Sequence, residues 1–283
     1  MGSVVCVGLT TLDVVQVTDR VPGPDEKLVA DDGWLAFGGP AANAAATCAA
    51  LGVDVRLVTA LGSGPVADLV RAGLAAAGVE VVDLAPDVRD LLAVSSVLVN
   101  DLGRAVVSCN AQAAPDLSGP AAAVPGAGAG DVVLVDGHHL GAATVLAGRS
   151  AGATVLADGG SWKPGLEDLL ARVGVAVLSA DFHVPGADDD LLTVVATMGP
   201  SVVAQTHGAG PVQVRTHDGT VHHVHPPQVP VTDTLGAGDV LHGAVAAALA
   251  RDADPLCAIT SGVDVASRSV QFRGALGWTD AHD

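Results

Sequence analysis

The seven residues Asp233-Thr-Leu-Gly-Ala-Gly-Asp239 carry the clearest chemical signal in the sequence. The glycines directly precede an apolar run with helical spacing, so the turn Gly236–Gly238 is predicted to enter a helix. Backbone N–H groups at such an entrance, together with the positive end of the helix dipole, bind anions. Asp239 places a proton acceptor beside them, which is the arrangement that phosphoryl transfer to a hydroxyl requires. The same residues also fit a simple tight turn whose aspartate is favoured by the dipole, so the rest of the chain must decide.

The turn Gly236–Gly238 must be positioned by the strands and helices that the sequence predicts. Short apolar runs alternate with segments of helical spacing, and this rhythm predicts a parallel sheet covered by helices. The expected strands are 3–8, 54–59, 79–82, 131–135, 154–157, 175–178 and 201–205. The expected helices are 41–51, 66–77, 142–149, 165–172, 188–198, 237–250 and 255–270. A hairpin of 211–215 and 220–224 is expected at one edge of the sheet.

Some extended stretches do not fit this rhythm and predict a small separate sheet. They are residues 14–21, 27–37 and 94–109. The last stretch reads as a hairpin with a four-residue loop, Asn100–Gly103. Because the sequence shows no internal repeat and no long linker, we expect a single domain, 1–283, with a lid formed by about 14–37 and 94–109.

Composition limits the possible partners. The chain has 283 residues and a net charge of −18, which argues against a nucleic-acid binder and against attraction to anionic membranes. Phosphorylated small molecules remain possible ligands, because backbone N–H groups and a metal ion can hold phosphate without basic side chains. The apolar residues are mostly Ala, Val and Leu, which suit closely packed helices and strands.

The four cysteines lack the spacing of a metal site or a disulfide framework. Cys6, Cys48, Cys109 and Cys257 are scattered, and we expect four buried thiols in a reducing cytoplasm. The N-terminus enters a strand directly, without a basic segment or a long apolar span. The sequence therefore predicts a cytoplasmic protein with no signal peptide and no membrane helix.

Four segments together resemble the ribokinase / phosphofructokinase-B family of carbohydrate kinases, in order and separation over essentially the whole chain. They are Gly8–Asp13, in which the opening strand ends at an aspartate, then Gly38–Asn43, Gly62–Asp68 and Asp233–Asp239. Within the family the sequence looks most similar to ketohexokinase-like members, at Gly62–Asp68, Val177–Asp181 and His225–Gln228. The resemblance implies a ribokinase-like α/β fold, a doubly wound and mostly parallel sheet flanked by helices, with a small β-sheet lid.

The same resemblance implies ATP-dependent phosphorylation of a hydroxyl of a ketose, furanose or related polyol, with Mg²⁺ and K⁺. It implies that Asp239 is the catalytic base and that the anion hole consists of Gly236, Ala237 and Gly238. The implied substrate contacts are Asp13, Gly38, Gly39, Asn43, Arg104 and His138. The implied nucleotide contacts are Thr206, Gly208, Gly236 and Gly238. Asp233 is implied to ligate the monovalent cation.

Three positions depart from the family pattern. Val184 stands where many members carry the glutamate of an Asn-x-x-Glu motif that organises water around magnesium. Pro40 stands where ketohexokinase-like members have a substrate-contacting asparagine, which weakens a fructose assignment. His242 replaces the usual asparagine just after the catalytic motif.

Other functions remain open beside a sugar kinase. A nucleoside kinase of the same fold is one, and a non-catalytic sugar- or nucleotide-binding relative is another, favoured by the missing glutamate. A dinucleotide-dependent oxidoreductase fits poorly, because Gly8–Asp13 lacks the Gly-x-Gly-x-x-Gly turn after the first strand. Exposed strand edges of the lid predict a homodimer that forms through it.

Overall fold

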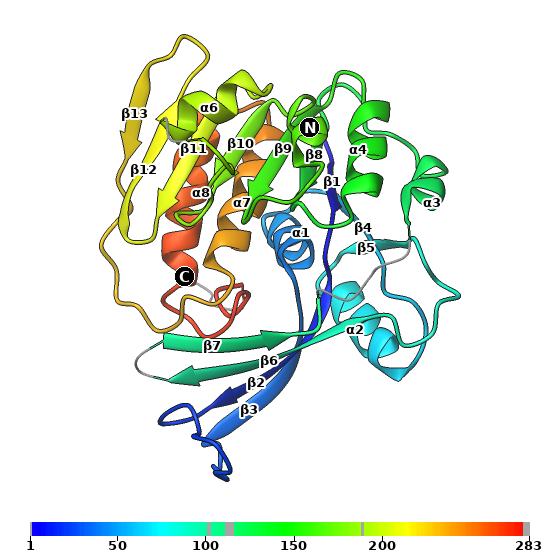
Figure 1. The fold of residues 1–283 in the computed structure, drawn as a ribbon, viewed down its shortest axis with the longest axis vertical. Helices are drawn as coiled ribbons and strands as arrows, with labels where there is room; N and C mark the ends of the chain where they lie inside the picture. The colour runs from blue at the N-terminus through cyan, green and yellow to red at the C-terminus, as the bar shows by residue number, and fades with distance from the viewer. Residues whose placement is uncertain (1, 101–102, 111–115, 188–189, 280–283) are drawn as a thin grey trace.

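The computed structural model describes residues 2–100, 103–110, 116–187 and 190–279 (Figure 1). Within them the chain forms a nine-stranded sheet and a four-stranded sheet, flanked by helices. The strands are β1 (Val4–Val7), β2 (Thr11–Val17), β3 (Asp32–Gly38), β4 (Val55–Thr59), β5 (Glu80–Asp83), β6 (Ala93–Asn100), β7 (Gly103–Ser108), β8 (Val132–Val135), β9 (Thr154–Gly159), β10 (Val175–Leu178), β11 (Val202–His207), β12 (Gly210–Arg215) and β13 (Val221–Val224). The helices are α1 (Pro40–Ala50), α2 (Pro65–Ala76), α3 (Ser118–Ala122), α4 (Leu140–Arg149), α5 (Leu166–Leu170), α6 (Leu191–Thr197), α7 (Ala237–Leu249) and α8 (Pro255–Ser269).

The large sheet has the order β13-β12-β11-β10-β9-β8-β1-β4-β5. Its strands from β11 to β5 pair in parallel, and the hairpin β12–β13 adds an antiparallel edge, as the sequence predicts. The central strands are short apolar runs buried on both faces, which is the pattern of a parallel sheet covered by helices. The predicted ribokinase-like α/β architecture is therefore confirmed.

Alternate residues of each central strand enter two different apolar cores. In β1, Val4 and Cys6 pack with α1, α2, α7 and α8, whereas Val5 and Val7 pack with α3, α4, α5 and α6. This alternation follows from the twofold periodicity of a strand. It places α1 and α7 on the same face of the sheet, and the first turns of these two helices carry much of the candidate site.

Small residues allow α1 and α7 to approach closely. A Cβ atom added to Gly243 of α7 would lie 2.5 Å from the carbonyl oxygen of Ala44 and 2.7 Å from the Cβ atom of Thr47, both in α1. The alanine-rich sequence of α1 is buried along most of its length. The close approach brings Asn43 of α1 to Asp239 of α7.

The predicted small sheet is present, with the order β3-β2-β6-β7. Figure 1 shows it set apart from the large sheet, beside the C-terminal loops drawn in red. Two side-chain contacts join it to the loops around α8: Arg104 of β7 donates to Thr234 Oγ1 at 3.0 Å, and Arg273 pairs with Asp32 of β3 at 3.1 Å.

Three details of the sequence interpretation are wrong. The opening strand ends at Val7, and Asp13 lies inside β2, because the chain leaves the large sheet and begins a strand of the small one. Asn100 and Gly103 pair with each other, which leaves 101–102 as the connection, outside the described residues, in place of a four-residue loop. Cys6 and Cys48 are buried, but Cys109 and Cys257 are exposed.

Among the helices of the described residues, none is long and apolar enough to cross a membrane.

Candidate active site

The carboxyl ends of the parallel strands meet at one edge of the large sheet, where open α/β folds bind ligands. Asp136 follows β8 directly, and Asp158 is the penultimate residue of β9. The first turn of α7 contacts the same region, because His242 reaches both Asp158 and the end of β10. Three carboxylates, Asp136, Asp158 and Asp239, therefore influence one another's ionisation here.

The turn Gly236–Gly238 begins α7 as predicted. Gly236 has a φ of 72°, and a Cβ atom there would lie 2.4 Å from the Cβ atom of Ala275, so only glycine fits. The N–H group of Ala237 donates to the Thr234 carbonyl oxygen at 3.3 Å. In the described part of the chain, the N–H groups of Gly238 and Asp239 donate to no protein acceptor, which leaves them free for an anion.

Asp239 lies in the first turn of α7 and is partly exposed. The side-chain amide of Asn43, itself buried, donates to Asp239 Oδ2 at 2.7 Å. Burial, together with the charge of Asp158, raises the pKa of Asp239 to about 7, although the Asn43 hydrogen bond and His242 act in the opposite direction. Burial thus acts against the helix dipole, which favours the ionised form. A carboxyl group that exchanges its proton near neutral pH suits a general base.

His242 and Asp158 lie behind Asp239 and were not recognised as a pair in the sequence. His242 Nδ1 lies 3.5 Å from Asp158 Oδ2, and both side chains are nearly inaccessible, with 7% and 11% exposed. Burial raises the pKa of Asp158, and the charge of His242 opposes that change. The only sequence signal was the histidine in place of the usual asparagine.

Asp136 organises the backbone at this edge. Its carboxylate accepts hydrogen bonds from the N–H groups of Leu9 at 2.8 Å, Ala41 at 3.1 Å and His138 at 2.8 Å. Burial alone would raise the pKa of Asp136, but the hydrogen bonds and the charge of His138 outweigh it and bring the pKa below its ordinary value. Asp136 therefore ties together β1, the start of α1 and the loop after β8, and the sequence analysis gave it no role.

The predicted substrate residues Asp13, Gly38 and Gly39 come together where the small sheet meets α1. Thr11 Oγ1 donates to Asp13 Oδ1 at 2.7 Å, and a Cβ atom on Gly38 would lie 2.0 Å from Asp13 Oδ2. Gly39 has a φ of 95° and precedes α1, and a Cβ atom there would lie 2.5 Å from the Leu9 carbonyl oxygen. Both glycines thus allow close packing that no other residue would permit.

Arg104 and His138 occupy the border of this region. Arg104 is exposed on β7, and its guanidinium reaches Thr234 of the turn before α7. His138 Nδ1 lies 3.3 Å from Asp136 Oδ1. Arg104 is thus held beside the turn before α7, and His138 beside Asp136.

Thr206, Gly208 and Asp233 lie in β11, after it and in the turn before α7, and among the described residues none of them hydrogen-bonds to Asp239. Thr206 and Gly208 lie at the end of β11, at the same sheet edge but two strands beyond β9. The Asp233 carboxylate accepts from the N–H groups of Leu235 at 2.9 Å and Gly274 at 2.8 Å, so it fixes the turn before α7.

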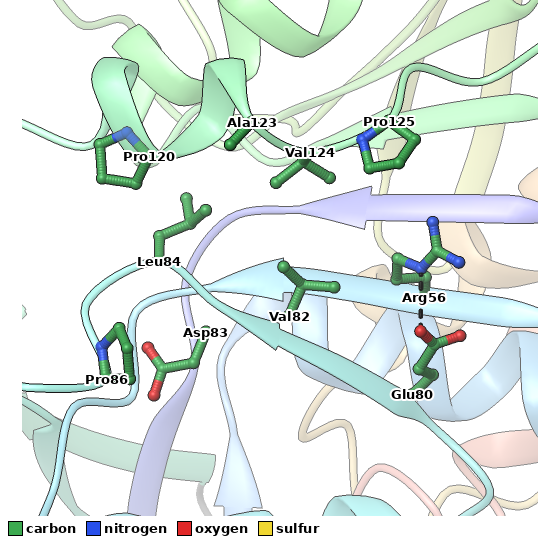
Figure 2. A pocket seen from close by; sticks show the side chains of 10 residues that line it. All are labelled: Arg56, Glu80, Val82, Asp83, Leu84, Pro86, Pro120, Ala123, Val124 and Pro125. Atoms are coloured by element: carbon green, nitrogen blue, oxygen red, sulfur yellow. Dashed lines mark hydrogen bonds and ion pairs between the residues drawn. The ribbon is translucent and has the colours of Figure 1, made fainter.

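A separate surface cavity of about 650 Å³ lies at the far edge of the large sheet, beside β5 and α3 (Figure 2). Its lining includes an ion pair of Arg56 with Glu80, and the apolar side chains Val82, Leu84 and Val124. It contains none of the residues singled out in the sequence, so the cluster around Asp239 is the better candidate for chemistry.

Comparison with known proteins identifies a family and a named relative. The family model for pfkB family carbohydrate kinases matches residues 1–155 and 163–280. An ATP-dependent ribose-1-phosphate kinase from Halopiger xanaduensis is 29% identical over 264 residues, covering 90% of this chain and 87% of its own.

Solved structures share the fold. Ribokinase from Thermotoga maritima matches with a TM-score of 0.77 and 20% identity, over 98% of this chain and 96% of its own. Arabidopsis thaliana ribokinase, solved with ribose and ATP, matches with a TM-score of 0.75 and 18% identity over 100% of both chains. Because the family model covers nearly the whole length, the protein belongs to the pfkB family of carbohydrate kinases and is a sugar kinase.

Proposed function

We propose that this sugar kinase transfers the γ-phosphoryl group of ATP to a sugar hydroxyl, with Asp239 as the base. The observation that supports this most strongly is the first turn of α7. There the carboxyl group of Asp239, whose pKa burial raises to about 7, adjoins free N–H groups at a helix N-terminus. A proton acceptor and an anion site are thus joined in one turn.

In the proposed reaction the sugar hydroxyl oxygen attacks the γ-phosphorus, and the bond from that phosphorus to the bridging oxygen of ADP breaks. The hydroxyl proton passes to Asp239. The free N–H groups at the start of α7, those of Gly238 and Asp239, stabilise the charge that develops on the phosphoryl oxygens. Loss of one comparable donor typically costs a factor of roughly 10²–10³ in rate.

For the acceptor we propose a furanose or ketose held by Asp13, Gly38, Gly39 and Asn43. Asn43 contacts Asp239 from α1, the other three lie where the small sheet meets α1, and Asp13 and Asn43 offer acceptors and donors for hydroxyl groups. Since the Halopiger relative is named for ribose 1-phosphate, that sugar phosphate is the first acceptor to test. Arg104, beside Thr234, and His138 are the side chains that we propose to receive its phosphate.

For the nucleotide we propose a site along the end of β11, at Thr206 and Gly208. Both lie at the ligand-binding edge of the sheet, and Gly208 has a φ of 60° in the turn toward β12. ATP bound there would point its phosphates toward the turn Gly236–Gly238.

We propose that the reaction uses Mg²⁺ and K⁺. In the described residues, no three His, Cys, Asp or Glu side chains are grouped to hold a metal ion, so we assign Mg²⁺ no protein ligand. Mg²⁺ in such enzymes is bound largely by substrate phosphates, whose charge it neutralises. The oxygens of Asp233 already accept N–H bonds from Leu235 and Gly274, but each keeps a lone pair for a monovalent cation.

We further propose that the small sheet acts as a lid over the acceptor and carries a homodimer contact. Its outer strands are β3 and β7, whose free edges can pair with another chain. Leu35, Val106 and Val107 on these strands are large apolar side chains exposed to solvent, at 56%, 50% and 74%. A second subunit that covers the strand edges and these apolar side chains would remove both from water.

The substrate proposal is tested by measuring ADP formation from ATP with Mg²⁺ and K⁺ across ribose, ribose 1-phosphate, ketohexoses, sugar acids and nucleosides. We expect turnover with a furanose or ketose, with or without a phosphate. Turnover with nucleosides alone would show that the acceptor is a riboside, as in a nucleoside kinase. Binding of ATP or sugar, seen as a raised melting temperature without turnover on any compound, would favour a non-catalytic binding protein.

A further inference from the structure

His242 makes contacts that an asparagine at this position could not reproduce. It lies one turn into α7, with 6% of the residue exposed. Its Nδ1 atom lies 2.7 Å from the carbonyl oxygen of Gly238 and 3.5 Å from Asp158 Oδ2. Its Nε2 atom lies 3.1 Å from the carbonyl oxygen of Val177, at the end of β10.

Each ring nitrogen therefore faces a backbone carbonyl oxygen, which can only accept a hydrogen bond. A neutral imidazole carries one N–H group, so it would leave one buried nitrogen lone pair pointing at a carbonyl oxygen. An unmatched buried polar group is costly. The imidazolium form donates from both nitrogens, and the carboxylate of Asp158 compensates its charge in a site that water hardly reaches.

We propose that His242 is held as an imidazolium paired with Asp158, and that this buried pair is a positioning device that fixes Gly238 and controls how readily Asp239 ionises. The inference rests on the proposed role of Asp239 as the base. His242 contacts the carbonyl oxygen of Gly238, and the same peptide group carries the N–H of Asp239, one of the free donors of the anion site. The pair thus acts on both parts of the proposed chemistry without touching substrate.

Other charged groups face this pair and Asp239 from the neighbouring elements. Asp136 acts on both Asp158 and Asp239, while His138 and Lys163 act on Asp158. Lys163 Nζ donates to the Gly137 carbonyl oxygen at 3.0 Å, so its charge is held at the same edge. Neither variant substitutes these groups, so a changed ionisation of Asp239 is assigned to the loss of His242 or Asp158.

The two members of the pair should shift the ionisation of Asp239 in opposite directions. Asp158→Asn removes a negative charge, so Asp239 loses its proton at lower pH. His242→Asn removes a positive charge and leaves Asp158 unpaired, so Asp239 loses its proton at higher pH. A neighbouring charge typically shifts the pH at which a carboxyl group is half ionised by about one unit. A purely structural role would move the midpoints together or leave them unchanged.

The experiment follows the Asp239 carboxyl carbon by ¹³C NMR against pH, in the wild type and in both variants, and needs no turnover. Asp239→Asn assigns the signal, and His223→Asn on exposed β13 is the matched control with an unchanged midpoint. Opposite shifts support the proposal. Shifts in the same direction, or no shifts, overturn it.

A second readout uses only the wild type, in case a variant does not fold. Long-range ¹H–¹⁵N spectra of histidine-labelled protein at pH 7 should show both His242 nitrogens protonated, and a neutral ring would overturn the proposal. Failure of the kinase assay with a positive NMR result would count against the proposed function alone. A working kinase with a neutral His242 would count against the pair alone.

Discussion

At the scale of single residues, opposing effects act on the ionisation of Asp239. It begins a helix and accepts a hydrogen bond from Asn43, and both effects favour its ionised form. Burial and the neighbouring carboxylate of Asp158 act in the opposite direction, and the pKa of Asp239 is raised to about 7. The result is a base that is strong enough to accept a proton and still substantially ionised near neutral pH.

This balance predicts the pH dependence of the reaction. Because the base works only when ionised, kcat/KM of the free enzyme should fall as pH decreases through about 7, where Asp239 takes up a proton. The measurement is kcat/KM for the acceptor from pH 5 to 9, with ATP saturating. A profile that stays flat down to pH 5 would contradict the proposed base.

At the scale of elements, the site depends on how closely α1 and α7 approach. Asn43 and Asp239 belong to different helices, and their 2.7 Å hydrogen bond exists only because Gly243 lets the two backbones meet. The turn before α7 has its own requirement for glycine, since Gly236 has a φ of 72° beside Ala275. Gly243 is thus required for packing against α1, and Gly236 for the backbone conformation of the turn.

A stability measurement tests the helix contact. Gly243→Ala places a methyl group against Ala44 and Thr47, and we expect a loss of roughly 1–3 kcal/mol in the free energy of unfolding, as for other overpacked cores. Gly148→Ala in α4, where the new methyl group meets no atom closer than 3.8 Å, is the matched control and should be neutral or stabilising. Equal stability of the two variants in urea denaturation would show that the contact is looser than described.

At the scale of the whole molecule, the small sheet packs on the main core through Leu12, Phe37 and Val94 and reaches the neighbouring loops through polar side-chain contacts. Arg104 to Thr234 and Arg273 to Asp32 are two of them, and both partners of the second pair are mostly exposed. A sheet with free edges at β3 and β7 and exposed apolar side chains suits an intersubunit contact.

Light scattering tests the proposed dimer. We expect the wild type to have twice the mass of one chain, and Val107→Asp on β7 to shift it to a single chain without changing the fold. Val221→Asp on β13, an edge strand of the large sheet, also replaces an exposed valine and should leave the dimer intact. A wild-type protein that elutes as one chain would reject the proposal.

Sequence patterns predicted the fold and the start of α7 because both depend on local signals. Apolar runs define the central strands, and Gly236 marks the N-terminus of α7. Asp13 was placed at the end of the first strand because nothing in the sequence between Val7 and Thr11 shows that the chain changes sheets. The pairing of Asp158 with His242 could not be predicted, since it depends on the order of β9, β10 and α7 in space.

The most direct test of the account is phosphoryl transfer by Asp239→Asn, which keeps the size of the side chain but removes the proton acceptor. With the acceptor identified in the panel, we expect kcat to fall by about 10²–10⁴, the range typical of a lost general base, while ATP still raises the melting temperature. Asp264→Asn on the exposed face of α8 is the control and should retain full activity. Turnover by Asp239→Asn at a rate near that of the wild type would contradict the assignment of Asp239 as the base.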